Sequence, residues 1–474
     1  MADTLALNAS GAPAGVLKLS RGGWQTGQQG PGSIGTNSYY VENIFEELDV
    51  PGEWFLRGDG TLTLIPPSDG PSDPTGVELV AALHSRVIQL RGASPTEFAH
   101  DITLRGLRIK HSKPTFMDSY EMPSGGDWTI HRGGAVFLDG TEDVVIDSLI
   151  VEQPGGNGIF LSNHAWRTAV TNNVINGTGD SAIVLVGSTE LMNGTRNTYP
   201  AFNNVTGNSA YNIGHYGKQV AAVFKSIAYR TLIERNVFFN SARSLVNYND
   251  AFRGGDILRG NVLFGAVTET ADHASFNSWD RQSYFWQIDG NFYVTPEVME
   301  IKNNLILNKD FLFGSENSDW SIDHDDASSF YEDSLNVMVY GAHKWRDGVH
   351  KWYFDNMYVT PSDAGDNDKG VGWYSQHTAS SKFYGNTLID WAAAPQFHFC
   401  WSNPNPKSDF DLHANKYFTP GNTTLPFKAG GGPCGEAASL AEWQTITQND
   451  AGSSISADMD VTRAVALAKV MLKY

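Results

Sequence analysis

The sequence predicts an all-β fold, a single-stranded right-handed parallel β-helix, in which the chain winds into a stack of short strands. Three observations lead to this fold class. A short phrase containing asparagine recurs along the chain, β-branched runs bounded by Gly, Asn and Asp lie between its copies, and helical periodicity is almost absent between residues 100 and 420. A leucine-rich repeat would show a leucine framework, and a propeller would show four strands per blade, so neither fits.

The recurring phrase consists of an apolar residue, two or three variable residues, asparagine and another apolar residue. Several of its intervals fall between about 25 and 30 residues, a period typical of solenoids. An asparagine at a fixed corner suits a tight, left-handed turn, and it can bond to its copies in coils about 4.8 Å away. The copies are Val170–Val174, Ile233–Val237, Leu258–Val262, Ile288–Phe292, Ile301–Leu305, Tyr353–Met357 and Phe383–Thr387.

Residues 37–67 are expected to cover the N-terminal end of the stack, because an open solenoid end is a template for aggregation. Residues 43–48 predict a short helix that stops before Pro51. Residues 54–56 and 61–64 then predict a β-hairpin.

The C-terminal end shows two helix signals. Ser439–Glu442 has the pattern of a capping box, and Val461–Leu472 is amphipathic and helix-prone, so it is expected to close the stack. No linker separates the segments, so the sequence predicts one domain. Its divisions are an N-terminal lead-in (1–36), a cover with the first strands (37–95), the β-helix (96–435) and a C-terminal cap (436–474).

Charge and hydropathy exclude two classes of partner. Lys and Arg total 33 against 52 Asp and Glu, a net charge of −19, which argues against a nucleic acid because phosphate binding needs a cationic surface. No apolar run approaches the roughly 20 residues of a membrane span. The N-terminus lacks the pattern of a signal peptide, and an extracellular location is expected from the fold class alone.

Two features concern covalent modification. The two cysteines, Cys400 and Cys434, fit one disulfide bridge or two free thiols equally well. Asn-x-Ser/Thr sequons, which are glycosylation sites in secreted proteins, occur at Asn8, Asn176, Asn193, Asn204 and Asn422.

Four polar stretches interrupt the repeat, and a β-helix aligns side chains of successive coils on one face. Together they supply carboxylates, imidazoles, cations and aromatic rings. The stretches are Ile213–Gln219, Val246–Arg253, Asp272–Arg281 and Ile322–Ser328.

Glycoside hydrolysis needs two carboxyl groups, one protonated as the acid and one ionised as nucleophile or base. The candidate catalytic residues are Asp272, Asp280, Asp325 and Asp326, with His273 to adjust their pKa values. The candidate substrate-binding residues are Trp279 and Tyr248 as a sugar platform, with Arg281, Asn277, Asp250, Lys218 and His324 as polar contacts. For Asp250 alone, capping of a turn is the stronger interpretation.

No cofactor is expected, with calcium as the alternative. Asp323, Asp325 and Asp326 could equally supply oxygen ligands to Ca²⁺. A calcium-dependent polysaccharide lyase would then use Lys218 or Arg253 as its base. The chain contains no P-loop, no zinc-type His/Cys spacing and no Gly-x-Ser-x-Gly elbow.

The segment from Tyr40 to Trp54 resembles the entry segment of secreted right-handed parallel β-helix glycoside hydrolases, among them glycoside hydrolase family 141. Further phrases resemble a recurrent set in β-helix proteins of this type: Gly179–Ile183, Tyr216–Gln219, Asn249–Asp250, Asp272–His273, Phe276–Gln282 and Ile322–Asp326. The resemblance covers most of residues 20–450. It implies a β-helix fold and a carbohydrate-active function, with α-L-fucosidase and xylanase among the family's activities.

Two functions follow from these observations. The first is an extracellular glycoside hydrolase with its acids in a groove on the β-helix. The second is a non-catalytic β-helix, either a glycan-binding module or a self-assembling subunit of an extracellular filament or coat.

Overall fold

The computed structural model describes the short strands β1 (Ala6–Leu7) and β2 (Leu17–Lys18) and most of the chain after residue 41. The described residues there are 42–71, 73, 76, 78–123, 128–188, 198–250, 252–270, 273–280, 286–288, 291–293, 296–309, 320–362, 372–373, 378–392, 395, 397, 410–422, 429–430 and 436–473.

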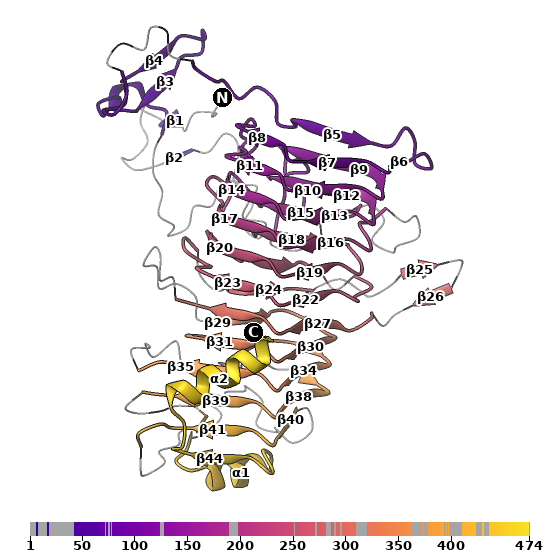
Figure 1. The fold of residues 1–474 in the computed structure, drawn as a ribbon, viewed down its shortest axis with the longest axis vertical. Coiled ribbons are helices and arrows are strands. Elements are labelled where there is room, and N and C mark those ends of the chain that lie inside the picture. The colour runs from indigo at the N-terminus through magenta and orange to yellow at the C-terminus, as the bar shows by residue number, and fades with distance from the viewer. Residues whose placement is uncertain are drawn as a thin grey trace.

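The fold is a right-handed parallel β-helix, as the sequence predicts. Three long parallel sheets run along the stack, and over most of the described chain successive strands pass through sheet 1, sheet 2 and sheet 3 in turn (Figure 1). Sheet 1 contains β5 (Ile88–Arg91), β9 (Val136–Glu142) with β6 (Ala99–His100) beside it, β12 (Ile159–Trp166), β15 (Ile183–Val186), β18 (Val223–Ser226), β21 (Val246–Tyr248), β24 (Ala274–Ser278), β29 (Trp320–His324), β32 (Ala342–Trp345) and β36 (Gly372–Trp373).

Sheets 2 and 3 are built from strands of mostly three to five residues. Sheet 2 contains β7 (Thr103–Arg105), β10 (Val145–Asp147), β13 (Ala169–Thr171), β16 (Asn204–Thr206), β19 (Leu232–Glu234), β22 (Ile257–Arg259), β27 (Met299–Lys302), β30 (Tyr331–Ser334), β34 (Lys351–Phe354), β38 (Ser381–Tyr384) and β40 (Phe410–His413). Sheet 3 contains β8 (Arg108–Lys110), β11 (Ile150–Glu152), β14 (Val174–Thr178), β17 (Ser209–Ile213), β20 (Val237–Ser241), β23 (Val262–Phe264), β28 (Leu305–Leu307), β31 (Val337–Val339), β35 (Met357–Thr360), β39 (Thr387–Asp390), β41 (Lys416–Phe418) and β44 (Ser454–Ser456).

One copy of the recurring phrase is not part of the stack. Residues 288–292 fall in an antiparallel hairpin of β25 (Trp286–Ile288) and β26 (Asn291–Tyr293), which projects from the rod in Figure 1. The prediction of a coil corner there is wrong, because β25 and β26 pair with each other and not with the strands of the three sheets. The other two-stranded pairs are β3 (Trp54–Leu56) with β4 (Leu62–Leu64), β33 (Gly348–Val349) with β37 (Thr378–Ala379), β42 (Ala429–Gly430) with β43 (Glu436–Ala437), and β1 with β2.

The corner asparagines form a continuous buried ladder between sheets 2 and 3. Asn261 is typical: its side-chain nitrogen donates to Ile233 O at 3.0 Å and to Asn304 Oδ1 at 2.9 Å. Its own Oδ1 accepts from the backbone and side-chain nitrogens of Asn236, both at 2.9 Å. The ladder consists of Asn173, Asn208, Asn236, Asn261, Asn304, Asn336, Asn356, Asn386 and Asn415.

The left-handed turn position belongs to the residue before each ladder asparagine. Arg235 has φ 53° and Gly260 has φ 64°, and each directly precedes a ladder residue. The expectation that the asparagine itself occupies the left-handed turn is therefore wrong. The asparagine keeps ordinary backbone geometry and uses its amide to satisfy buried backbone groups at the corner.

The two ends of the chain meet the stack differently. The predicted N-terminal helix is a single 3₁₀ turn, Phe45–Glu47, and the hairpin β3–β4 follows. The hairpin stands apart from the stack in Figure 1, and its Trp54 and Leu56 are 61% and 50% exposed. At the C-terminus, α1 (Leu440–Thr447) begins at Ser439, whose hydroxyl accepts from Glu442 N, as the capping box predicts. Its Trp443 is buried in the main core, so α1 packs on the end of the stack.

The second C-terminal helix, α2 (Val461–Leu472), has the predicted bounds but a different place. It lies along the outer face of sheet 3 rather than across the end of the stack (Figure 1). Ala464 and Met459 pack there against Val337, Met357 and other apolar residues of sheet 3. The amphipathic pattern identifies a helix with one buried face, but it does not say which surface that face covers. No helix in the described part of the chain is long and apolar enough to cross a membrane.

Candidate functional site

The outer face of sheet 1 changes from apolar to polar along the stack. Side chains alternate between the interior and the outer face of each strand, so the register aligns one outward column across all coils. The first part of this column is apolar: Phe137, Phe160, Val184 and Phe224. Its continuation is polar: Asn247, Asn277, Asp323 and Lys344.

Residues 128–132 cover the apolar part of this column. Trp128 and Ile130 are 1% and 4% exposed and pack with the column's apolar side chains in one cluster. Arg132 fixes the segment to sheet 1 by donating to Val186 O at 3.1 Å and to Gly187 O at 2.8 Å. The polar part of the column therefore begins where this cover ends.

Asp180 ties the preceding stretch of the same loop to the stack. Its carboxylate accepts hydrogen bonds from Tyr120 Oη at 3.0 Å and from Thr115 Oγ1 at 3.3 Å. Burial raises the pKa of Asp180 to about 6, although these hydrogen bonds lower it. The buried Asp180 carboxylate thus holds the loop that contains Thr115 and Tyr120 against the stack.

An aromatic and basic border separates the two parts of the face. The Trp128 ring lies 5.7 Å from the His273 ring, centroid to centroid, and the Arg243 guanidinium lies 5.2 Å from the Trp128 ring. Arg243 also contacts the His273 ring nitrogens at 2.9 Å. His273, a candidate to adjust carboxyl pKa values, instead lies at this border.

Beyond the border, four aspartates form what we call the acid cluster: Asp280, Asp323, Asp325 and Asp326. Backbone bonds join the two turns that carry them, because Asp325 N donates to Ser278 O at 2.8 Å and Asp280 N donates to Asp326 O at 3.0 Å. Asp280, Asp325 and Asp326 were predicted as catalytic residues. Asp323 was predicted only as a possible calcium ligand.

Two cations hold the acid cluster together. Lys344 Nζ lies 3.2 Å from Asp323 Oδ2 and 3.5 Å from Asp325 Oδ1. Arg346 lies 3.1 Å from Asp325 Oδ1 and 2.9 Å from Asp326 Oδ1. Partial burial lowers the pKa of Arg346, but the charges of Asp325 and Asp326 outweigh it and the net shift is upward. Arg346 thus stays charged beside the acids.

The cluster opens to solvent on the side of Arg346. The side chain of Arg346 is 40% exposed and that of Asp326 is 19% exposed, whereas that of Asp323 is fully buried. Among the described residues, no group of three or more His, Cys, Asp or Glu side chains is placed to hold a metal ion. Lys344 and Arg346 supply the positive charge next to the carboxylates.

A second polar network lies directly beneath the cluster, inside the coil. Ser278 Oγ lies 2.7 Å from His324 Nδ1, and His324 Nε2 lies 2.8 Å from Asp333 Oδ2. His343 Nε2 reaches the same oxygen at 2.9 Å, and Tyr358 Oη lies 2.7 Å from His343 Nδ1. Burial lowers the pKa of both imidazoles and raises that of Asp333.

This Ser–His–Asp sequence has the connectivity of a nucleophile, base and orienting acid, but it cannot meet a substrate. Ser278, His324 and Asp333 point into the packed interior between the three sheets, on the opposite side of sheet 1 from its outer face. The network instead fixes the strands β24, β29 and β32, whose outward residues form the polar column.

Lys351 connects the interior to the turn that carries Arg346. It is fully buried, and its Nζ donates to Arg346 O at 2.6 Å and to Asp347 O at 2.9 Å. Burial lowers its pKa from 10.5 to about 7, against the opposing charges of Asp347 and Asp323. Lys351 therefore titrates near neutral pH in the folded protein.

This shift gives a pH dependence with a definite sign. Between pH 7 and 10 the unfolded chain binds the Lys351 proton and the folded chain does not, so the free energy of unfolding rises with pH. The slope is at most about 1.4 kcal/mol per pH unit. Urea unfolding of wild type and Lys351→Met at pH 7, 8 and 9 should show this rise only in wild type. The exposed Lys416→Met serves as control, and equal slopes in wild type and Lys351→Met would contradict the assignment.

The structure brings five of the predicted site residues together: Asn277, Trp279, Asp280, Asp325 and Asp326. Trp279 is only 2% exposed, so the sugar platform predicted for it is closed in this conformation. Sequence reasoning missed Asn247, Lys344 and Arg346 as site residues. The available signal for Lys344 and Arg346 was their spacing of two residues, because extended chain places such residues on one face and Arg346 directly follows strand β32.

Four predicted substrate contacts lie elsewhere. The predicted sugar contacts of Tyr248 and His324 are wrong, because both side chains point into the interior and are at most 1% exposed. For Asp250 the structure supports turn capping and not substrate binding, because its carboxylate accepts hydrogen bonds from Ile227 N at 2.8 Å and Ser226 Oγ at 2.6 Å. Lys218 bonds to Gly214 O and pairs with Glu269 at 2.7 Å, away from the acid cluster.

Several other predictions remain without a structural test. Asp272, Arg281, Cys400, Cys434, Asn8 and Asn193 lie outside the described residues. The sequons at Asn176, Asn204 and Asn422 stay predictions. Arg253, the alternative lyase base, lies over the rings of Tyr199 and Tyr229, at 5.4 and 4.1 Å from their centroids.

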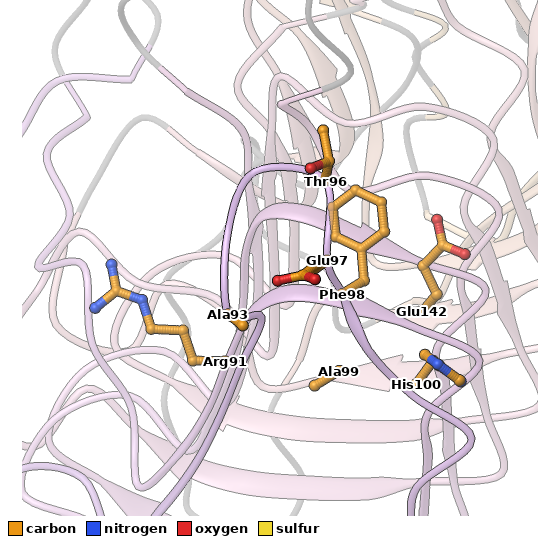
Figure 2. A pocket seen from close by; sticks show the side chains of 8 residues that line it. All are labelled: Arg91, Ala93, Thr96, Glu97, Phe98, Ala99, His100 and Glu142. Atoms are coloured by element: carbon orange, nitrogen blue, oxygen red, sulfur yellow. The ribbon is translucent and has the colours of Figure 1, made fainter.

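A separate pocket of about 610 Å³ lies beside β5, β6 and β9 (Figure 2). Figure 2 shows the carboxylates of Glu97 and Glu142 on opposite sides of the Phe98 ring. Burial raises the pKa of Glu142, but hydrogen bonds from His164 and Arg167 outweigh it, so the pKa is lowered. An ion-paired, readily ionised carboxylate does not suit the role of general acid, and we place the candidate site at the acid cluster.

The comparisons with known proteins concern the fold. No protein-family model matches the sequence, and no curated protein matches it. A solved structure described as a glycoside hydrolase is similar with a TM-score of 0.51 and 13% identity, over 67% of this chain and 56% of that protein. The structure of XylC with xylose has a TM-score of 0.40 and 11% identity, over 76% of this chain and 53% of that protein. The tailspike protein of E. coli bacteriophage HK620 with a pentasaccharide has a TM-score of 0.34 and 13% identity, over 73% of this chain and 58% of that protein. This chain thus spans little more than half the length of these proteins, and it shares with the first of them the β-helix fold.

Proposed function

We propose that this protein is a glycoside hydrolase that acts on a polysaccharide outside the cell, with the acid cluster as its catalytic centre. The observation that carries the proposal is the pair of joined turns that brings Asp280 and Asp325 side by side: Asp325 N donates to Ser278 O at 2.8 Å, and Asp280 N donates to Asp326 O at 3.0 Å. Glycoside hydrolysis needs two carboxyl groups on one such surface. The fold shared with a glycoside hydrolase is consistent with this function.

Within the cluster we assign different roles to two aspartates. Asp325 lies between Lys344 and Arg346, so we assign it the anionic role of nucleophile or base. Asp280, held beside Asp326 by a backbone bond of 3.0 Å, is the candidate acid that protonates the leaving oxygen. Arg346, at the exposed side of the cluster, would orient the substrate.

A second candidate function is glycan binding without catalysis. Its support is the ion pairing itself, because Asp323, Asp325 and Asp326 all have a cation within 3.5 Å and Asp280 is 2% exposed. Acids that serve only to brace a surface would show the same pairing. Such a β-helix could also assemble with copies of itself into a filament or coat.

The test is a screen for reducing-sugar release from xylans, fucosylated glycans, pectins and algal polysaccharides, with calcium and with a chelator. Release that needs no calcium supports the hydrolase. Unsaturated products that disappear with chelator would replace it by a calcium-dependent lyase. No release from any substrate, together with retained binding to one of them, would leave the glycan-binding function.

A further inference from the structure

Asn247 and Asn277 form a buried amide pair on the outer face of sheet 1. They are register partners on the adjacent strands β21 and β24, and both are 0% exposed. One hydrogen bond joins them, from Asn277 Nδ2 to Asn247 Oδ1 at 2.9 Å. Among the residues that the structure describes, no hydrogen-bond partner lies within reach of Asn247 Nδ2 or Asn277 Oδ1.

The corner ladder of the same protein shows how a structural asparagine is treated. The amide of Asn261 makes bonds with both its nitrogen and its oxygen, and its neighbours Asn236 and Asn304 do the same. Buried amides with unbonded atoms are costly, at roughly 1–3 kcal/mol for each group. The unbonded atoms of Asn247 and Asn277 therefore lack a partner that the described residues supply, and a bound polar ligand would provide one.

The pair presents one donor and one acceptor side by side. This is true whichever way the two amides are turned, because a single bond between them always leaves one nitrogen and one oxygen. Ser275 lies two residues before Asn277 on the same face, and in the described structure its buried hydroxyl also lacks a hydrogen-bond partner. Asn247 Nδ2, Asn277 Oδ1 and Ser275 Oγ are therefore three neighbouring buried polar atoms without a hydrogen-bond partner among the described residues.

We propose that Asn247 and Asn277 together bind one hydroxyl group of a sugar, with Ser275 available to a second. This inference rests on the proposed function and adds the residues that select the ligand. A hydroxyl group donates and accepts at once, so it satisfies both free amide atoms. A carboxylate only accepts and would face the free carbonyl oxygen, and an ammonium group only donates. The pair thus selects neutral sugar hydroxyls over uronate groups.

The position of the pair fits this role. In the outward column, Asn277 is the register partner of Asp323, so the amide pair lies one strand spacing, about 4.8 Å, from the acid cluster. On the other side, the next outward residue is Phe224, where the cover around Trp128 begins. A sugar bound at the pair would therefore lie between the aromatic border and the catalytic acids.

The test measures binding and stability separately. The probes are an array of neutral xylo-oligosaccharides, fucosylated oligosaccharides and oligogalacturonates, followed by calorimetry with the strongest neutral binder. We expect neutral ligands to bind, and Asn247→Ala and Asn247→Ala/Asn277→Ala to weaken binding about ten- to a hundredfold. Asn240→Ala is the matched control, because Asn240 forms the same single amide bond with Asn212, 2.7 Å long, on an exposed surface.

Thermal unfolding excludes a merely structural role. The double variant removes two unbonded buried groups, so its melting temperature should not fall, whereas removal of a structural amide would lower it. If the variants bind the glycan more weakly and neither wild type nor any variant hydrolyses it, the proposed role of the amide pair is supported and the proposed hydrolase activity is overturned. Hydrolysis that is unaffected in the double variant would overturn the pair and leave the hydrolase standing. Preference for oligogalacturonates, or binding of no glycan, would overturn the pair.

Discussion

Replacing Asp325 by Asn should reduce hydrolysis of the substrate found in the screen by about a thousandfold or more. The substitution keeps the shape of the side chain but removes the negative charge that Lys344 and Arg346 face, at 3.5 and 3.1 Å. Asp280→Asn should cause a similar loss, because an amide cannot donate the proton that the leaving oxygen needs. Initial rates across a pH range, with substrate well above KM, are the measurement.

Two controls make this result specific. Asp147→Asn removes an aspartate of similar exposure that pairs with Arg105 at 2.9 Å on sheet 2. It should leave the rate unchanged. Arg346 retains Asp326 in the Asp325→Asn variant, so the melting temperature should change little. Full activity of both Asp325→Asn and Asp280→Asn would refute the assignment of the acid cluster.

The largest expected loss of stability is that of Asn261→Ala. The substitution removes four buried hydrogen bonds, which involve Ile233 O, Asn304 Oδ1 and both nitrogens of Asn236. Asn304 Oδ1 keeps its bond from the backbone nitrogen of residue 261, and Asn236 Nδ2 keeps Val205 O, but the backbone nitrogen of Asn236 loses its side-chain partner. At roughly 0.5–1.5 kcal/mol for each lost bond, and more for an unpaired buried group, the free energy of unfolding should fall by at least about 2 kcal/mol. That is a large share of the roughly 5–15 kcal/mol that stabilises a typical domain.

Urea unfolding followed by circular dichroism measures this loss. Asn240→Ala again provides the comparison, since it removes one exposed amide bond on the same protein. Its effect should stay within about 0.5 kcal/mol. Comparable losses in the two variants would mean that the ladder is no more important than a surface contact.

The sequence reveals the coil corners because their physics is local. An asparagine that must satisfy buried backbone groups recurs at almost every turn, and apolar residues such as Ile233 and Val237 flank it. Helix α1 was predictable for the same reason, since Ser439 and Glu442 are three residues apart in the sequence. Contacts of this kind depend on spacing within one segment.

The interior and the face of each strand were harder to predict. The aromatic and imidazole groups of Tyr248 and His324 resemble ligand contacts in composition, but alternation turns both inward. Lys225 is a stronger case: it is fully buried and pairs with Asp256, thirty-one positions further along the chain. Which coils place two such residues together depends on the lengths of the intervening turns, and these are irregular.

The site was predictable in part for the same reason. Asp280, Asp325 and Asp326 stand out as acids in dense polar stretches. Asn247 does not, because a single asparagine among many asparagines gives no signal. Its distinction is an unbonded buried amide, which only the three-dimensional arrangement reveals.

The asparagine ladder also gives the rod an electrical direction. Each side-chain nitrogen donates to the next amide toward the C-terminal end, so the dipoles of successive amides add along the axis. The last amide, Asn415, donates to Asp450 Oδ1 at 3.0 Å. A carboxylate thus lies at the positive end of an aligned column of dipoles, as an acidic residue does at the first turn of an α-helix. The stack is polarised from end to end by groups that never meet solvent.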